Sequence, residues 1–250
     1  MVTKEEKAMS FYEEIADFYD LIFPLNRAQI GFVKASVEPP YNEKRILDIG
    51  CGTGDLALAL AEEGFMIEGI DSDAEMLRRA RSKIRQGSLV AFAHKDMREV
   101  SSLSCPATFD AVLCFGNTLV HLDSSRDIED FFGQTKTVLK ENAPFLFQIL
   151  NYDHILDHDI RELPLIEDEE IKFERRYEFK GSENRIAFRT LLTVKKRGKK
   201  IANEILLYPI RRQELEEGLR KQGFTDIVFY GDFEKGELKT QSLPLVGEAR

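Results

Sequence analysis

The residues best suited to chemistry lie between positions 46 and 55, where an apolar run leads into a glycine-rich loop flanked by acids. The loop contains Gly50, Cys51, Gly52 and Gly54, and the acids are Asp48 and Asp55. Glycine lets the backbone turn sharply and approach a ligand without an intervening Cβ atom. A helix that starts near residue 54 directs its free N–H groups toward the same ligand. The stretch therefore predicts a backbone cradle for an adenosine-containing ligand.

A further acid follows at a distance that supports the same interpretation. The apolar segment 65–70 is a candidate strand, and it is followed by Asp71, about twenty residues beyond the glycine loop. In doubly wound folds, a carboxylate at this place accepts hydrogen bonds from both hydroxyls of a ribose. Asp71 is therefore the expected ribose-binding residue.

The spacing of the loop distinguishes between two kinds of nucleotide ligand. Dinucleotide-binding folds use the pattern G-x-G-x-x-G, whose last glycine allows close helix packing beside a pyrophosphate. This chain has G-x-G-x-G instead, with Asp48 before it and Asp55 after it. Two acids repel a polyanion and attract a cation such as a sulfonium or an α-amino group. The expected ligand is therefore cationic.

Together these features resemble the class I S-adenosylmethionine-dependent methyltransferases. That family has an acidic strand residue before G-x-G-x-G, here Asp48, and a ribose-binding acid at the end of the second strand, here Asp71. The resemblance spans most of the chain. It implies a Rossmann-like α/β fold with a seven-stranded, mostly parallel sheet, and S-adenosyl-L-methionine as the cofactor.

Three shorter segments are similar to glycine and glycine/sarcosine N-methyltransferases in particular. They are FDAVLCFGNTLVHL at 109–122, NYDHIL at 151–156 and LYP at 207–209. This narrower resemblance implies a methyl acceptor held near the methionine end of the cofactor. The residues that it assigns to the acceptor side are Asn117, His121, Asn151 and Tyr208.

The same resemblance assigns residues to the cofactor. Tyr12 and Tyr19 would close over it from the N-terminal helix, and Arg27 would pair with its methionine carboxylate. Asp96 would accept a hydrogen bond from the adenine amine while Met97 packs on the ring. The remaining expected cofactor residues are Asp48, Gly50, Cys51, Gly52, Gly54, Asp71, Ser72, Met76, Phe115 and Gly116.

Two questions about the acceptor side stay open at this point. His121 is suited to act as a general base, because a methyl acceptor must present a free lone pair, but it is equally suited to fix its own loop. An amino-acid acceptor needs a cation opposite its carboxylate, for which a bidentate arginine is the natural choice. The candidates are Arg161, Arg175, Arg176 and Arg189, and none can be aligned with the family's arginine.

Two other clusters are interpreted as structural. His154 and His158 stand four residues apart, but without a third spaced ligand they indicate a solvated acidic segment, and no metal is expected. The basic run at 195–200 contains Gly198 between basic residues. It is expected to be the exposed tip of a hairpin and not a phosphate site.

Composition sets limits on the partners and the compartment. A chain of 250 residues can bury one large core, and 43% hydrophobic and 32% charged residues are typical of a globular protein. The net charge of −9 disfavours nucleic acid and anionic membranes as partners. Three isolated cysteines and the lack of an apolar N-terminal segment favour a reducing, cytoplasmic location. A homo-oligomer is compatible with these features.

The elements that would position these residues alternate along the chain. Strands are expected at 45–49, 65–70, 89–93, 109–115 and 143–150, and helices at 27–36, 54–63, 73–86 and 126–140. This alternation predicts a parallel sheet that is covered on both faces. Residues 211–222 are expected to form a helix, and segments 225–233 and 242–248 two final strands of the same sheet.

Two regions depart from this alternation. Aromatic and apolar residues between 5 and 22 follow one helical stripe, which ends at Pro24. Segment 170–210 contains three consecutive strands with turns at Gly181-Ser182 and Gly198, which predicts an antiparallel lid. The expected organisation is a helical cap at 1–40, a cofactor-binding core at 41–165 and 211–250, and a β lid at 166–210 over the acceptor site.

The function implied by these resemblances is methyl transfer from S-adenosylmethionine to a small molecule, with the amine of glycine or sarcosine as the expected acceptor. Two alternatives remain open. The acceptor could be a nitrogen or oxygen of another small metabolite. The chain could also be a regulatory subunit, because a glycine loop ensures cofactor binding without ensuring turnover.

Overall fold

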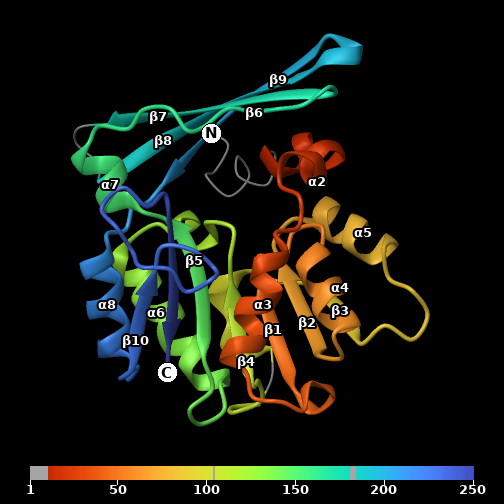
Figure 1. The fold of residues 1–250 in the computed structure, drawn as a ribbon, viewed down its shortest axis with the longest axis vertical. Helices are drawn as coiled ribbons and strands as arrows, with labels where there is room; N and C mark the ends of the chain where they lie inside the picture. The colour runs from red at the N-terminus through yellow and green to blue at the C-terminus, as the bar shows by residue number, and fades with distance from the viewer. Residues whose placement is uncertain (1–10, 104, 181–183) are drawn as a thin grey trace.

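A seven-stranded sheet forms the centre of this computed structural model, which describes residues 11–103, 105–180 and 184–250 (Figure 1). Its strands are β1 (Arg45–Ile49), β2 (Met66–Asp71), β3 (Val90–His94), β4 (Ala111–Cys114), β5 (Phe145–Leu150), β10 (Ile227–Tyr230) and β11 (Pro244–Ala249), in the order β3-β2-β1-β4-β5-β11-β10. The first five run parallel, and β11 is antiparallel to both neighbours. The expectation of a mostly parallel sheet of seven strands is confirmed.

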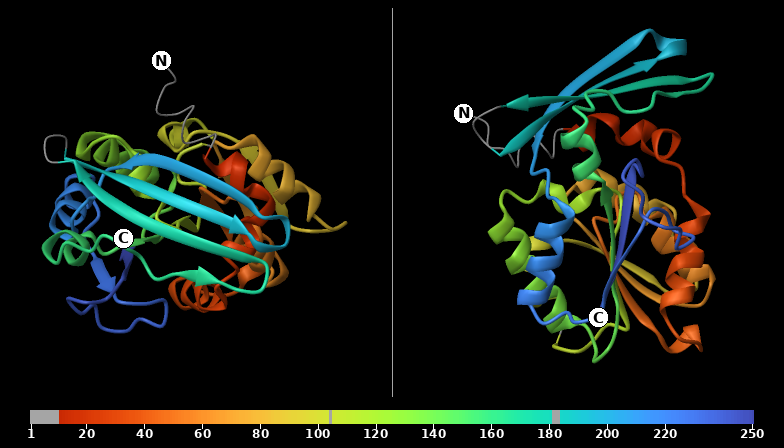
Figure 2. Two further views of the ribbon diagram at one scale, coloured as in Figure 1. Left: turned by 90° about the horizontal axis from the view of Figure 1, so that it is seen from above. Right: turned by 60° about the vertical axis from the view of Figure 1, so that its left-hand side comes forward.

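Helices cover both faces of this sheet, as the alternation of elements predicts. One face carries α3 (Arg27–Ser36), α4 (Asp55–Glu62) and α5 (Ala74–Ser82), and the other carries α6 (Ser125–Val138) and α8 (Arg212–Lys221) (Figures 1 and 2). In β1, Ile46 packs into the apolar cluster on one face, whereas Leu47 and Ile49 pack into the cluster on the other. Because both faces of β1 are buried, its sequence is apolar nearly throughout.

Short local signals fix where three helices begin. Asp73 accepts the N–H of Met76 at the start of α5, and Ser124 accepts the N–H of Asp127 at the start of α6. The residue before α4 is Gly54, which has a φ of +80° and no side chain to cap the helix. As a result, α4 and α5 begin close to the carboxyl ends of β1 and β2.

Residues 166–210, the segment expected to form the lid, contain a second, antiparallel sheet that crosses above the main sheet (Figures 1 and 2). Its strands are β6 (Ile166–Glu167), β7 (Ile171–Lys180), β8 (Arg185–Val194) and β9 (Lys199–Leu207). Three long strands match the expectation, and the two-residue β6 is an addition. Gly198 turns the chain into β9 at a φ of +60°, whereas the turn at 181–182 lies outside the described residues.

The N-terminal segment, residues 11–23, lies between the lid and the main sheet (Figure 1). Residues 11–15 are helical, and η1 (Ala16–Phe18) and α2 (Tyr19–Ile22) follow. The helix expected at 5–22 is thus interrupted by a 3₁₀ turn, and its part before residue 11 lies outside the described residues. Phe11 contacts Phe188 of the lid, and Phe23 contacts Phe173. These aromatic contacts join the segment to the inner face of the lid.

Several short elements were not predicted. They are η2 (Tyr41–Glu43), η3 (Met97–Ser102), η4 (Thr118–His121), α7 (Tyr152–Asp157) and η5 (Lys195–Arg197). Some expected elements are also shorter than predicted. β4 ends at Cys114, because Gly116 and Asn117 have φ values of +74° and +66° and turn the chain out of the sheet. The division into cap, core and lid at the expected boundaries stays a prediction.

No helix in the described ranges is long and apolar enough to cross a membrane.

Candidate active site

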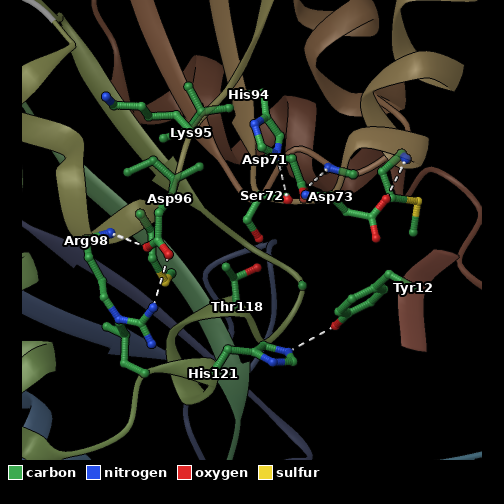
Figure 3. A pocket seen from close by; sticks show the side chains of 18 of the residues that line it. Tyr12, Asp71, Ser72, Asp73, His94, Lys95, Asp96, Arg98, Thr118 and His121 are labelled. Atoms are coloured by element: carbon green, nitrogen blue, oxygen red, sulfur yellow. Dashed lines mark hydrogen bonds and ion pairs between the residues drawn. The ribbon is translucent and has the colours of Figure 1, made fainter. Parts of the chain in front are cut away.

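A cavity of about 480 Å³ lies at the carboxyl ends of β1, β2, β3 and β4 (Figure 3). The expected site residues that line it are Tyr12, Tyr19, Gly50, Gly52, Asp71, Ser72, Met76, Asp96, Met97, Phe115, Gly116 and His121. Small ligands of open α/β sheets bind at this edge, where strand ends and helix starts converge. The volume suits a small-molecule ligand or cofactor.

The glycine loop is held against β2 and has no space for a side chain at Gly50. The N–H groups of Gly50 and Cys51 both donate to the carbonyl of Ile70, at 2.9 and 3.0 Å. Gly50 and Gly52 have φ values of +69° and +55°. A Cβ atom at Gly50 would lie 2.6 Å from Cγ2 of Thr118. The loop therefore needs glycine at position 50 for both its conformation and its space.

Asp71 lies in the wall of the cavity at the end of β2 (Figure 3). Its Oδ2 accepts the N–H of Gly52 at 2.8 Å, and its Oδ1 accepts the N–H of Asp73 at 2.9 Å. Burial raises the pKa of Asp71 to about 6, although these two hydrogen bonds favour the charged form. Each carboxylate oxygen can accept more than one hydrogen bond, so two ribose hydroxyls can still bind here.

Asp48 lies beside a second cavity, of about 360 Å³, which also borders the glycine loop. The two cavities share Tyr19, Gly50, Phe115 and Gly116, and Cys51 borders the second one. Asp48 is 4% exposed, and burial together with the negative charge of Asp71 raises its pKa to about 7. Among the described residues no basic side chain pairs with Asp48. A cationic ligand group in this cavity would therefore meet a carboxyl group without a counterion.

The turn after β3 forms another wall of the cavity. Asp96 accepts the backbone N–H of Arg98 at 2.7 Å, and its second oxygen accepts from the guanidinium at 3.0 Å. Arg98 also reaches Asp123, which follows η4, at 3.1 Å. Asp96, Met97 and Arg98 thus line the cavity on one braced turn, as Figure 3 shows for the two charged residues.

Tyr12 and His121 meet at the side of the cavity that faces the N-terminal segment (Figure 3). The hydroxyl of Tyr12 lies 3.0 Å from Nε2 of His121, although the two residues are 109 positions apart. Burial raises the pKa of Tyr12 well above its usual value, so the phenol stays neutral and can donate. The N-terminal segment and η4 are thereby joined at the site.

Ionic contacts hold the N-terminal segment over the glycine loop. The hydroxyl of Thr53, inside the loop, donates to the carboxylate of Asp20. Lys83, at the end of α5, reaches Asp20 and Asp55 at 2.6 Å each. These contacts keep Tyr19 close above the loop, where its ring would lie 3.4 Å from a Cβ atom at Gly52.

Known proteins match both the sequence and the fold. Residues 46–142 match a family model described as a methyltransferase domain. A glycine/sarcosine N-methyltransferase of Aphanothece halophytica is 28% identical over 219 residues, which make up 82% of this chain and 74% of that protein. The CcbJ methyltransferase of Streptomyces caelestis has a TM-score of 0.78 at 21% identity, over 94% of this chain and 95% of that one. An S-adenosylmethionine-dependent methyltransferase of Clostridium acetobutylicum has a TM-score of 0.76 at 20% identity, over 96% and 98% of the two chains.

The family match covers the glycine loop, Asp71 and the ends of the strands that form the cavity. Residues 46–142 thus match a methyltransferase domain, and the matches together support a class I S-adenosylmethionine-dependent methyltransferase. S-adenosylmethionine is accordingly its cofactor. This assignment favours an enzyme over the non-catalytic regulatory subunit that the sequence left open.

The residues of the methyltransferase fit each part of this cofactor. The buried carboxylate of Asp71 would hold the ribose, and the turn with Asp96 and Met97 would border the adenine. Asp48, without a counterion, would face the positively charged methionine end. At Gly50 and Gly52 the backbone would approach the ligand in space that a Cβ atom would otherwise fill.

Two residues expected on the acceptor side brace the structure and do not line either cavity. Asn117 donates to the hydroxyl of Tyr152 at 3.0 Å and accepts the N–H of Leu150 at 2.9 Å. Asn151 caps α7, and its amide donates to two carbonyls of the loop before β11 at 3.0 and 3.4 Å. Both side chains are thus used within the protein, and their expected roles at the acceptor stay a prediction.

Tyr208 also lies outside the lining of both cavities. Its hydroxyl donates to Glu214 of α8, and its backbone N–H donates to the carbonyl of Val120 at 2.9 Å. Tyr208 thus joins the end of the lid to the main body, and its expected role at the acceptor stays a prediction.

Two expected cofactor residues lie outside the lining of both cavities, Arg27 and Gly54. Arg27 is the first residue of α3, and the side chains of Asn26 and Gln29 border the second cavity instead. Gly54 serves packing, because a Cβ atom there would lie 2.5 Å from the ring of Phe92. Successive side chains at the start of a helix point in different directions. The number of residues between Arg27 and the glycine loop therefore does not show whether the Arg27 side chain faces the cavity.

Further residues line the first cavity without having been expected from the sequence. They are Ile49, Ile70, Asp73, His94, Lys95, Arg98, Glu99, Thr118 and Leu122. Most of them stand at or just after the end of a main-sheet strand. Since ligands bind beyond the carboxyl ends of parallel strands, this position was a signal that could have found them.

The histidine pair lies in α7 and just after it, and the basic run lies between β8 and β9. The rings of His154 and His158 are tilted by 49° with centroids 4.8 Å apart, and Nδ1 of His158 lies 3.1 Å from the carbonyl of His154. In the part of the chain that is described, no group of three or more His, Cys, Asp or Glu could hold a metal. The basic run forms η5 between β8 and β9, where Lys195 and Lys196 pair with glutamates at 2.7 and 2.9 Å.

Proposed function

We propose that this methyltransferase methylates the amino nitrogen of a small amino acid, with glycine or sarcosine as the acceptor. The observation that carries this proposal is the environment of Arg175. Its partly buried guanidinium donates from Nη2 to the carbonyl of Pro164 at 2.7 Å but has no carboxylate partner among the described residues, and its Nε is buried without a hydrogen bond. An acceptor with a carboxylate would supply the missing partner. The name of the relative from Aphanothece halophytica, a glycine/sarcosine N-methyltransferase, supports the same class of acceptor.

Arg175 differs from the other three candidate arginines. Arg161, Arg176 and Arg189 are exposed and form ion pairs with neighbouring acids. Their partners are Asp159 for Arg161, Glu162 for Arg176, and Glu178 with Glu204 for Arg189. In β7, Arg175 stands two residues from both Phe173 and Tyr177, which are buried on the inner face of the lid. Because side chains two residues apart in a strand share a face, Arg175 also lies on this inner face. Among these four arginines, Arg175 alone faces inward and lacks an acidic partner.

The inner face of the lid carries a polar row at the position of Arg175. Arg175 pairs with Thr190 across β7 and β8, and Thr190 pairs with Asn203 across β8 and β9. Oγ1 of Thr190 and Nδ2 of Asn203 are buried without a hydrogen-bond partner, as Nε of Arg175 is. Buried polar atoms without partners are costly, so three in one row favour an absent polar ligand or water at this place.

Polar side chains lead from Arg175 toward the cofactor cavity. Tyr177 stands two residues further along β7, and its ring lies 6.3 Å from that of Tyr152. The hydroxyl of Tyr152 in turn accepts from Asn117, the residue after Gly116, which lines the cavity. Arg175 itself lines neither cavity, so the proposal requires that the acceptor extend from Arg175 along this path to the cofactor.

The protein's part in the reaction is mainly to position the acceptor. When bound, S-adenosylmethionine supplies a methyl group on a positively charged sulfur for in-line displacement. Arg175 would fix the acceptor by its carboxylate and so reduce the freedom of its nitrogen. Tyr12 and Tyr19 would cover the cavity and exclude water from it. The hydroxyl of Tyr12 lies 3.0 Å from Nε2 of His121, so His121 would orient Tyr12 over the cavity.

A substrate panel tests this proposal. The purified protein would be incubated with S-adenosylmethionine and each acceptor, and the release of S-adenosylhomocysteine measured. We expect turnover with glycine and sarcosine and none with ethanolamine or glycinamide, which are amines without a carboxylate. The variant Arg175→Met should raise the acceptor KM about tenfold or more, with little change in cofactor affinity, because it removes a charge-assisted contact.

Arg176→Met is the matched control, because Arg176 is the next residue in β7 but is exposed and paired with Glu162. It should leave the acceptor KM unchanged. Equal turnover of carboxylate-free amines, or an unchanged KM in Arg175→Met, would contradict an amino-acid acceptor. Turnover confined to a different amine or to a hydroxyl would instead indicate another small metabolite.

A further inference from the structure

The lid contacts the main body on both sides of His121. On one side, the N–H of Tyr208 donates to the carbonyl of Val120 at 2.9 Å. On the other side, Arg185, the first residue of β8, reaches Asp123. Arg185 and Tyr208 belong to the same end of the lid, because their neighbours Ile186 and Leu207 pair in the β8–β9 ladder. This end of the lid is therefore attached to the segment that contains His121.

Asp123 receives two arginines from different parts of the protein. Nη1 of Arg185 lies 2.9 Å from Oδ1 of Asp123, and Nη2 of Arg185 donates to the backbone carbonyl of Asp123 at 3.0 Å. Arg98, from the turn after β3, lies 3.1 Å from Oδ2. The two carboxylate oxygens thus contact different partners. Asp123 forms a bridge between the lid and that turn.

Arg98, on the other end of this bridge, belongs to the cofactor cavity. Its backbone N–H and its guanidinium both bind the carboxylate of Asp96, at 2.7 and 3.0 Å. Its carbonyl accepts from Gln134 of α6 at 2.7 Å, which anchors the turn to the main body. A ligand that contacts this turn can therefore contact Arg98, which forms an ion pair with Asp123.

We propose that Asp123 is a positioning residue that couples the lid to the occupancy of the cofactor cavity. A single ion pair at this exposure contributes little, but one carboxylate shared by two arginines restrains both segments in one geometry. A cofactor bound against Asp96 and Arg98 restricts Arg98, and restricted Arg98 restrains Asp123 and, through Arg185, the start of β8. The lid then opens less often. This inference rests on the cofactor site alone and is independent of which acceptor is used.

Hydrogen–deuterium exchange with S-adenosylhomocysteine, in the absence of any acceptor, tests the coupling. Each variant would be saturated according to its own affinity, measured by calorimetry. In the unmodified protein, we expect the ligand to slow exchange about threefold or more both around β2 and in β8 and β9 of the lid. In Asp123→Asn, which keeps the shape but removes the charge, slowing should persist around β2 and be lost in the lid.

Two substitutions in the lid extend the test. Arg185→Met should give the same loss as Asp123→Asn, and Arg185→Lys should restore part of the effect by keeping the charge. Arg185→Met also tests the link if Asp123→Asn fails to fold. Glu129→Gln is the matched control, because it breaks an ion pair with Lys221 of 2.7 Å between α6 and α8, away from the lid. If the ligand protects the lid as strongly in Asp123→Asn or Arg185→Met as in the unmodified protein, the proposal is wrong. It is also wrong if the ligand does not protect the lid of the unmodified protein.

Discussion

Asp48 and Asp71 lie on neighbouring parallel strands, and the two acids border the same glycine loop. Burial, and then the negative charge of Asp71, raises the pKa of Asp48 to about 7. Burial also raises the pKa of Asp71 to about 6. In the absence of a ligand the pair therefore holds protons at a pH where ordinary aspartates have lost them.

Cofactor affinity should consequently rise with pH. A positively charged ligand favours the ionised carboxylates, so binding below pH 7 must displace protons and becomes weaker as the pH falls through the two pKa values. We expect S-adenosylmethionine to bind about tenfold more tightly at pH 8 than at pH 5.5. Calorimetry in two buffers of different ionisation enthalpy would measure both the affinity and the proton release. The variant Asp48→Asn should remove the part of the dependence near pH 7, and a flat profile in the unmodified protein would reject the link.

Replacing Asp71 by alanine should weaken cofactor binding by about 1.5–3 kcal/mol, because it leaves a pair of buried ribose hydroxyls without an acceptor. The N–H groups of Gly52 and Asp73 lose their acceptor at the same time. Asp71→Asn keeps one acceptor oxygen and should cost less. Titration with S-adenosylhomocysteine, alongside thermal unfolding to separate loss of fold from loss of binding, would show the difference. Unchanged affinity in Asp71→Ala would place the ribose elsewhere.

Gly50→Ala should lower the free energy of unfolding by about 1–3 kcal/mol, since alanine is strained at a φ of +69°. The new Cβ atom would also lie 2.6 Å from Cγ2 of Thr118. Adding Thr118→Ala should recover part of this loss by removing the clash but not the strain. Urea denaturation of the single and double variants measures both terms. Full recovery in the double variant would mean that the backbone conformation contributes nothing.

Asn151→Ala should reduce stability and not only turnover. The side chain caps α7 and donates to two backbone carbonyls, so its removal leaves buried groups without partners and should cost about 1–3 kcal/mol. Denaturant unfolding would measure this loss. Asn142→Gly is the control, because it replaces an exposed asparagine away from the site, in a turn where φ is +58°. If Asn151→Ala is fully stable but has impaired turnover, the result would indicate that Asn151 contacts the acceptor.

Much of the fold could be predicted because its signals are local. The apolar run of β1, the glycines that follow it and Asp71 after the next strand are separated by short stretches of chain, and each has a local physical reason. Alternation of strands and helices then allows few topologies. The short elements η3, η4 and α7 escaped prediction because each has six residues or fewer, too few to show a periodic pattern.

The sequence by itself determined the cofactor chemistry, since a glycine loop, its flanking acids and the acid after β2 act within one strand–helix–strand unit. Only the tertiary structure decided the direction of side chains contributed from distant segments. It brought Tyr12 to His121, turned Asn151 and Tyr208 into braces, and left Arg175 as the inward-facing arginine of four candidates. The physical reason is that a side chain's direction depends on which distant surface its element packs against, and local spacing carries no information about that surface.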